Sequence, residues 1–112
     1  MNWHPLTSEQ SIHDLVDRSR VVPCLIFKHS TRCPISSIAK MRLEEGWDFE
    51  SDQLEPYYLD LISFRALSNL VATQFDVAHE SPQVLVIKDG ECTYDTSHLD
   101  INISELHECY QD

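Results

Sequence analysis

Cys33 stands where an apolar stretch gives way to a segment with helical spacing. Residues 21–27 are apolar, residues 28–32 are polar, and Cys33 and Pro34 open the next segment. Proline is favoured at the first position of a helix, because its missing N–H has no intrahelical partner there. We therefore expect a strand over residues 21–28 to deliver Cys33 to the N-terminus of a helix.

This placement predicts a nucleophilic cysteine. The thiolate is the reactive form in thiol-disulfide exchange. The unpaired N–H groups and positive dipole end at a helix N-terminus favour that anion, and Arg32 adds a neighbouring positive charge. Ser36 lies three residues further on, where its hydroxyl or its N–H would point at the sulfur. The alternative is that Cys33 is an ordinary first residue of a helix, but a thiol is a poor substitute for the usual serine, threonine, asparagine or aspartate cap.

The other cysteines show no pairing motif with Cys33. The chain has four cysteines and no Cys-x-x-Cys spacing, and Ser36 occupies the position of a second cysteine. We interpret Cys24 and Cys109 as small buried residues, since free cysteine is among the most buried residue types. Cys92 is left open as either buried or redox-active.

The histidines predict no zinc site. None of the six has a spacing typical of zinc ligands, so no metal is expected. His29, four residues before Cys33, is interpreted as a strand-end residue. The alternative is that it biases the thiolate or binds a metal together with Cys33.

The charge of the chain argues against nucleic acid as a partner. Eight basic residues stand against 19 acidic ones, which gives a formal net charge of −11 and would repel a phosphate backbone. Six acidic residues cluster within residues 44–55, at Glu44, Glu45, Asp48, Glu50, Asp52 and Glu55. We interpret this stretch as a solvated loop, with a cation site or a surface for a basic partner as the alternative.

The length and the N-terminal sequence indicate one small domain in a reducing compartment. The 112 residues are enough for one hydrophobic core, and we assign residues 1–112 to one domain. No apolar run approaches the roughly 20 residues that span a bilayer, and the first residues lack the features of a signal peptide. We therefore expect a cytoplasmic protein with no membrane partner.

The periodicity predicts a mixed α/β fold. In chain order, we expect a helix at about 8–19, a strand at 21–28, a helix at 34–45, a polar loop at 47–55, a strand at 57–62, a helix at 63–75, strands at 83–88 and 91–96, and a helix at 102–110. Two strand-helix-strand crossovers make their strands parallel, and the Asp89-Gly90 turn adds an antiparallel hairpin. The result is a four-stranded mixed sheet with helices on both faces.

Local patterns predict caps and buried faces within these elements. We expect Thr7 with Gln10, and Asn102 with Glu105, to form capping boxes, and Ser63 to cap the third helix. Two faces follow from the spacing: Ile35, Ile38 and either Ala39 or Arg42 on the second helix, and Cys92, Tyr94 and Thr96 on one side of the last strand.

The motif and the element order resemble a known family. Cys33-Pro34-Ile35-Ser36 at a strand-to-helix turn resembles the single-cysteine active site of a thioredoxin-like fold. The longer string Phe-Lys-His-Ser-Thr-Arg-Cys-Pro-Ile-Ser, residues 27–36, is similar to the monothiol bacilliredoxin family. The resemblance extends from Thr7 to about Tyr110. Arg32 is a departure, because the family motif has threonine immediately before the cysteine and Thr31 here lies one position earlier.

The resemblance implies an activity and a set of site residues. It implies exchange of mixed disulfides between protein cysteines and a low-molecular-weight thiol, typically bacillithiol, with Cys33 as the nucleophile. It makes Pro82 the cis-proline opposite the active site, with Ser81 presenting backbone groups to an extended substrate, and it adds Thr31 to the substrate-binding residues. No tightly bound cofactor is implied. The small thiol is a co-substrate, S-thiolated proteins are the clients, and a second thiol molecule or a thioredoxin-type reductase regenerates Cys33.

Two other functions remain open on the sequence. In one, Cys33 from two subunits, with a small thiol, holds an iron–sulfur cluster, although the relatives that do so have a Cys-Gly-Phe-Ser motif and Pro34-Ile35 departs from it. In the other, the chain is a non-catalytic thioredoxin-like interaction module.

Overall fold

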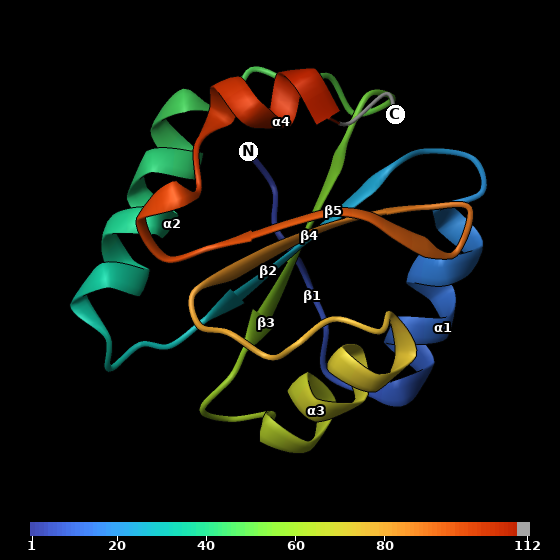
Figure 1. Cartoon of the computed structure of the whole chain (residues 1–112). Coiled ribbons are helices and arrows are strands. Elements are labelled where there is room, and N and C mark those ends of the chain that lie inside the picture. The colour runs from blue at the N-terminus through green and yellow to red at the C-terminus, as the bar shows by residue number, and fades with distance from the viewer. Residues whose placement is uncertain (110–112) are drawn as a thin grey trace.

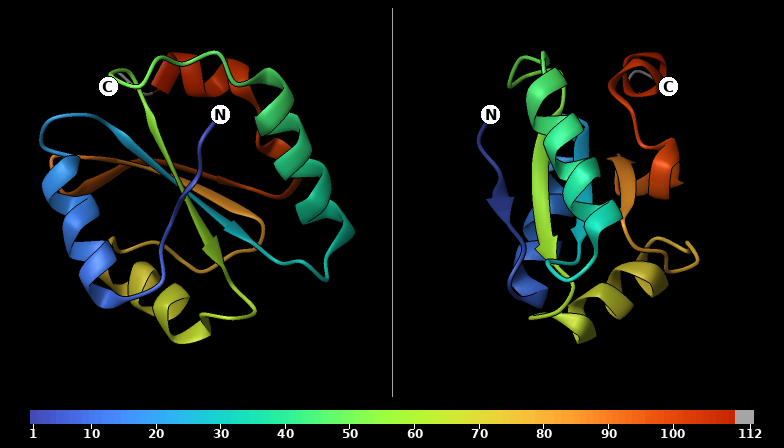
Figure 2. Two further views of the ribbon diagram at one scale, coloured as in Figure 1. Left: turned by 180° about the vertical axis from the view of Figure 1, so that it is seen from behind. Right: turned by 90° about the vertical axis from the view of Figure 1, so that its left-hand side faces the viewer.

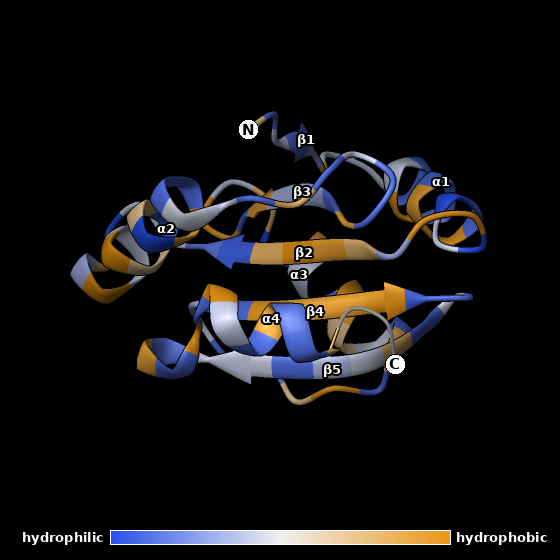
Figure 3. Cartoon of the chain, turned by 90° about the horizontal axis from the view of Figure 1, so that it is seen from above, coloured by the Kyte–Doolittle hydropathy of each residue, from blue (hydrophilic) through white to orange (hydrophobic). Residues whose placement is uncertain are grey.

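A five-stranded mixed sheet forms the centre of the molecule. The computed structural model describes residues 1–109. The strands follow one another across the sheet in the order β1-β3-β2-β4-β5, as Figure 3 shows from above. Their bounds are β1 His4–Pro5, β2 Cys24–His29, β3 Glu55–Asp60, β4 Gln83–Lys88 and β5 Glu91–Ser97. β1 and β2 run parallel to β3, whereas β4 runs antiparallel to both β2 and β5.

Helices cover both faces of this sheet. Figure 1 and Figure 2 show α1 and α3 on one side and α2 and α4 on the other. The helices are α1 Glu9–Arg18, α2 Pro34–Gly46, α3 Arg65–Gln74 and α4 Ile103–Cys109, with a short 3₁₀ helix, η1, at His98–Asp100. Among residues 1–109, no helix combines the length and the apolar character needed to cross a membrane.

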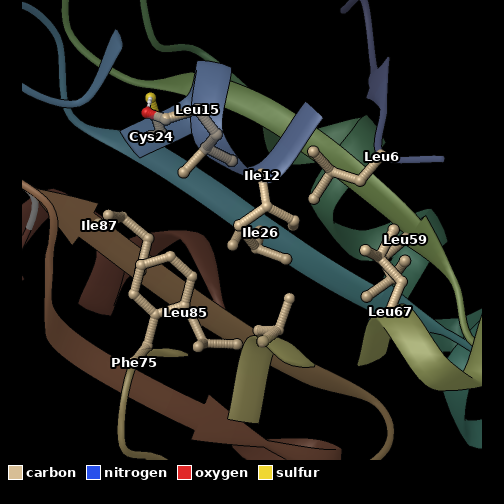
Figure 4. Packing of buried hydrophobic residues seen from close by; sticks show 11 residues of the cluster. Leu6, Ile12, Leu15, Cys24, Ile26, Leu59, Leu67, Phe75, Leu85 and Ile87 are labelled. Carbon is tan, nitrogen blue, oxygen red and sulfur yellow. Dashed lines mark hydrogen bonds between the residues drawn. The ribbon is translucent and has the colours of Figure 1, made fainter. Parts of the chain in front are cut away.

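The alternation of side chains along β2 divides the core into two layers. Every residue of β2 is buried, as expected of a central strand that is covered on both faces. Cys24 and Ile26 pack beneath α1 and α3 (Figure 4), whereas Leu25 and Phe27 pack beneath α2 and α4. The strand is thus held from both sides, and so is the loop that follows it.

The sheet has one strand more than the sequence predicts. β1 consists of only two residues, which pair with Tyr57 and Tyr58 of β3. Two residues carry no measurable periodicity, and one of them is a proline, which disfavours a strand prediction. The prediction of a mixed sheet with helices on both faces is confirmed.

The phase of α2 differs from the prediction. Ser36, Ala39 and Leu43 form its buried face, whereas Ile35 and Ile38 are 40% and 38% exposed. Two isoleucines three residues apart suggested the opposite face, which was wrong. The sheet-facing position next to the loop is taken by a serine because its hydroxyl has buried partners there.

A β-bulge changes the faces of β5. Val86 pairs with Tyr94, but the next residue, Ile87, pairs with Cys92, so the register shifts by one. Cys92 therefore packs with the α1 and α3 layer and Tyr94 with the α2 and α4 layer. A bulge moves every later side chain to the other face, which is why the predicted alternation from Cys92 to Tyr94 failed.

Two of the predicted helix caps are replaced by neighbours. Ser8, with Ser11, forms the capping box of α1 in place of Thr7 with Gln10. Ser63 donates its hydroxyl to the Asp60 carboxylate at 3.0 Å, and Phe64 is the N-cap residue of α3. The predicted pairing of Asn102 with Glu105 is confirmed, because Asn102 Oδ1 accepts the Glu105 N–H at 2.9 Å. Tyr110, assigned to the last helix from the sequence, lies outside the described residues.

Candidate active site

Cys33 is the N-cap residue of α2, at the end of the sheet where β2 ends. Its N–H donates to the Ser30 carbonyl at 3.2 Å, and its carbonyl accepts the Ser37 N–H at 3.1 Å. Pro34 is in the first turn of α2, as expected. The thiol is partly exposed and makes no capping hydrogen bond to the helix. Backbone hydrogen bonds therefore fix the position of Cys33 and leave its sulfur open to a reactant.

The Ser36 side chain points away from the Cys33 sulfur and forms hydrogen bonds that stabilise the loop before α2. Its side chain is fully buried, and Oγ lies 2.6 Å from Nδ1 of His29. Oγ also accepts the Ser30 N–H at 3.0 Å. The sequence suggested that the Ser36 hydroxyl would point at the Cys33 sulfur, but it joins the end of β2 to the start of α2 instead.

His29 takes part in these hydrogen bonds as a neutral ring. It lies between Phe27 and Tyr58, with ring centroids 5.7 Å from each. Burial, reinforced by the charge of Lys40, lowers the pKa of His29. A neutral ring accepts the Ser36 hydroxyl proton at Nδ1 while Ser36 accepts from Ser30. His29 is thus a positioning residue for the loop, a role that its place at the strand end did not reveal.

Arg32 and Thr31 are exposed on the loop between Ser30 and Cys33. The Arg32 N–H lies 3.4 Å from Oγ of Ser30. Its guanidinium forms no ion pair with the described residues, so it contributes a positive charge at the loop surface rather than a fixed contact. Thr31 lies in the wall of a cavity beside the loop.

Ser81 and Pro82 lie at the same end of the sheet as Cys33. The Ser81–Pro82 peptide bond is cis, as the resemblance implied. Gln83 pairs with Lys28 in the antiparallel β2–β4 ladder, which places Pro82 next to the end of β2. The Pro82 carbonyl accepts the His98 N–H at 2.9 Å. Oγ of Ser81 is buried and has no hydrogen-bond partner among the described residues.

An open cavity of about 660 Å³ lies between α2 and β3 beside the loop. His29 and Thr31 line its end near Cys33, and Tyr58 lines its floor. The remaining lining comes from one edge of α2, namely Ser37, Lys40, Met41, Glu44 and Glu45. Sequence patterns missed this cavity because it joins residues that are far apart in the chain.

Cys24 and Cys92 lie away from this site, and Cys109, which was expected to be buried, is partly exposed at the end of α4. Cys24 is fully buried at the opposite end of β2, about 16 Å of strand from His29 at 3.3 Å per residue. Burial raises the pKa of the Cys24 thiol to about 12, with a further contribution from Glu55. Burial also raises the pKa of Cys92, which pairs with Ile87 of β4 at the same end of the sheet as Cys24. None of the four cysteines forms a disulfide in the described part of the chain.

Lys28 is an unexpected buried cation on the other face of β2. It is fully buried, and its Nζ donates to the Ser68 carbonyl at 3.2 Å and lies 3.2 Å from Nδ1 of His79. Burial without a carboxylate partner lowers its pKa to about 8. The one polar residue facing the α1 and α3 layer from β2 was the available signal in the sequence.

The acidic stretch at 44–55 is only partly a solvated loop. Glu44 pairs with Lys40 at 3.0 Å, Asp48 lies 2.6 Å from His107, and Glu55 pairs with Arg18 at 3.1 Å. Asp48 and Glu55 therefore connect separate segments of the fold, whereas the Glu44 pair lies within α2. No group of three or more potential metal ligands occurs among residues 1–109.

Solved structures that are similar to this chain define its class. A structure described as a provisionally assigned oxidoreductase with a thioredoxin fold is 30% identical, with a TM-score of 0.83, and the match covers 97% of this chain and 93% of that one. Thioredoxins from Malassezia sympodialis and Fasciola hepatica are 14% and 17% identical, with TM-scores of 0.76 and 0.69. Those matches cover 98% and 94% of this chain and 89% and 93% of theirs. The fold is that of the thioredoxin-like proteins.

The family is more specific than the fold. The model of the family described as "Monothiol bacilliredoxin BrxC" matches residues 4–106. This chain belongs to the monothiol bacilliredoxin family, as the string at residues 27–36 indicated, and it has the fold of a redox protein.

Proposed function

We propose that this chain is a monothiol thiol-disulfide oxidoreductase that removes a low-molecular-weight thiol from protein mixed disulfides through Cys33. The observation that carries the proposal is the position of Cys33, which is partly exposed at the start of α2. Three residues later, where a second cysteine would stand, the chain has Ser36, which is buried and hydrogen-bonded. The proposed thiol is bacillithiol, which the resemblance at residues 27–36 implies. Thr31, Ser81 and Pro82 are proposed to contact the substrate.

The cycle needs one cysteine of this chain. The Cys33 thiolate attacks the sulfur of the small thiol in the mixed disulfide, and the bond between that sulfur and the client breaks. The client leaves as a thiolate and takes a proton, while Cys33 carries the small thiol in a new disulfide. A second small thiol attacks the sulfur of the carried one, releases the symmetrical disulfide and restores the Cys33 thiolate. A thioredoxin-type reductase would supply the same two electrons.

The arrangement of the other cysteines supports this single-cysteine cycle. A local disulfide would need a second thiol within about 4.5 Å at Cβ, but that position belongs to Ser36. Cys24 is buried at the far end of the sheet. The proposed clients are S-thiolated proteins in a reducing compartment such as the cytoplasm, where such adducts form under oxidative stress.

Substitution of Cys33 by serine tests the proposal. Cys33→Ser is expected to abolish release of the small thiol from a client mixed disulfide, because the hydroxyl cannot attack sulfur at neutral pH. The fold should persist, since serine is a good N-cap residue. Turnover is followed by mass spectrometry and folding by circular dichroism. Cys92→Ser is the matched control and should retain activity. Undiminished turnover by a folded Cys33→Ser protein would contradict the proposal.

A further inference from the structure

Exposed apolar side chains gather on α2 and next to it. Of the six large apolar side chains exposed among the described residues, Ile35, Ile38 and Met41 lie on α2, and Leu99 lies on η1. η1 packs against α2 and begins at His98, whose N–H is bonded to Pro82. The apolar side chains thus surround the end of the molecule that carries Cys33.

In the part of the chain that the structure describes, these side chains lie outside the buried core and remain partly exposed. The buried face of α2 is formed by Ser36, Ala39 and Leu43. Met41 is 50% exposed and borders the cavity between α2 and β3. Ile35, Ile38 and Met41 are three residues apart in turn, so they form a ridge that starts two residues after Cys33.

The far end of this ridge is negatively charged. Lys40 and Glu44, which both line the cavity, neutralise each other in an ion pair of 3.0 Å. Glu45 also lines the cavity and forms no ion pair with any described residue. The chain as a whole carries a net charge of −11. The cavity next to the ridge therefore favours a cation over an anion.

We propose that Ile35, Ile38, Met41 and Glu45, here called the α2 docking surface, bind the client segment that follows the modified cysteine. The inference rests on the proposed function, because a client whose cysteine reacts at Cys33 must lie over the adjacent surface. The ridge takes an apolar residue of the client, and Glu45 takes a lysine or arginine. The expected clients are proteins in which one extended segment contains the reactive cysteine, an apolar residue and a lysine or arginine.

Helix and strand geometry sets the spacing of these client residues. Glu45 is twelve residues from Cys33, which corresponds to about 18 Å along α2 at 1.5 Å per residue. An extended peptide covers that distance in about five residues at 3.3 Å each. The basic residue is therefore expected about five positions from the client cysteine, with the apolar residue between them.

Chromophoric mixed disulfides test docking separately from the small thiol. Two otherwise identical peptides carry a cysteine linked to 5-thio-2-nitrobenzoate, with leucine at the second position after it and either lysine or glutamate at the fifth. The Cys33 thiolate attacks the peptide sulfur, forms the Cys33–peptide disulfide and releases the coloured thiolate. Initial rates are measured at low salt, with Cys33→Ser as the blank and the symmetrical disulfide of the chromophore as the reference.

Wild-type protein is expected to react about three-fold or more faster with the lysine peptide than with the glutamate peptide, which is the size of a partly exposed ion pair. Glu45→Gln should remove most of that preference, whereas Glu91→Gln, at the far end of the sheet, should keep it. Ile38→Ser with Met41→Ser should lower the rate with both peptides relative to the reference. Val21→Ser, which removes an apolar side chain that is 75% exposed before β2, should not.

The outcomes separate the two proposals. A Cys33 that does not react even with the reference disulfide contradicts the proposed function. A Cys33 that reacts with the reference but treats both peptides alike contradicts docking on α2. A dimer in sedimentation that Ile38→Ser with Met41→Ser dissociates would also overturn the inference, because a second copy would then cover the ridge.

Discussion

Ser36 and His29 connect the two elements that present Cys33. The hydroxyl of Ser36 accepts the buried Ser30 N–H and contacts Nδ1 of His29. Ser36 therefore links the start of α2 to the end of β2 and to the loop between them. A serine at the position of a second cysteine thus has a structural role in addition to preventing a local disulfide.

Removing that hydroxyl should destabilise the protein. Ser36→Ala leaves the Ser30 N–H and Nδ1 of His29 without a partner in a buried site, which costs about 1–3 kcal/mol of unfolding free energy. Urea denaturation measures the loss. Ser37→Ala, at the exposed neighbouring position, is the control and should change stability by less than about 0.5 kcal/mol. Equal stability of the two variants would show that the hydrogen bonds of Ser36 to Ser30 and His29 do not stabilise the fold.

Lys28 should make stability depend on pH in the alkaline range. Its pKa is lowered from 10.5 to about 8 in the folded state by burial. Between these values the unfolded chain binds the proton and the folded chain does not, so the free energy of unfolding rises with pH from about 8 to 10.5. Lys28→Met removes this gain, which is on the order of 3 kcal/mol over the range.

The measurement is the difference in unfolding free energy between wild type and Lys28→Met at pH 7 to 10. Other groups that titrate in this range, such as Cys92, are common to both proteins and cancel. A difference that stays constant with pH would mean that Lys28 is charged and solvated in the folded protein.

At the scale of elements, α2 begins after Cys33 and depends on a narrow buried face. Leu43 is fully buried among the residues beneath α2 and α4. Leu43→Ala is expected to cost about 2–5 kcal/mol, because a cavity replaces a packed side chain. Met41→Ala on the exposed side should cost far less. Chemical denaturation distinguishes them, and similar losses in both would contradict the observed phase of the helix.

The elements themselves could largely be predicted, whereas their faces could not. The buried run of β2, the proline after Cys33 and the Asp89-Gly90 turn each have a local cause, and α2 and the hairpin formed where the sequence placed them. The phase of α2 depended on the hydrogen bonds of Ser36 to the end of β2, which no helical spacing encodes. The bulge in β5 and the pairing of β1 with β3 likewise depend on neighbouring strands.

The candidate active site, too, could be predicted from the sequence only in part. Cys33, Pro34 and the cis bond before Pro82 could be predicted from the motif and its family resemblance. The cavity lined by Lys40, Glu45 and Tyr58 could not, because tertiary packing brings the edge of α2 against β3.

At the scale of the whole molecule, the sheet order brings Cys33 and Pro82 to the same end of the sheet. β2 and β4 are adjacent and antiparallel, so the loop after β2 and the cis-proline before β4 meet at one end. Cys24, Cys92 and the hairpin lie at the other end. Separation of Cys33 from the other thiols of the sheet is thus a property of the topology, and it is what the single-cysteine cycle requires.

The state of Cys33 in oxidant-treated cells tests the central claim most directly. The protein is isolated from its own cells with acid quenching and alkylation, and the tryptic peptide 33–40 is weighed. The account predicts that this peptide carries one small thiol in a disulfide, released by reductant, and the added mass identifies that thiol. A disulfide from Cys33 to another cysteine of the chain, or an unmodified Cys33 under conditions that S-thiolate other proteins, would contradict it.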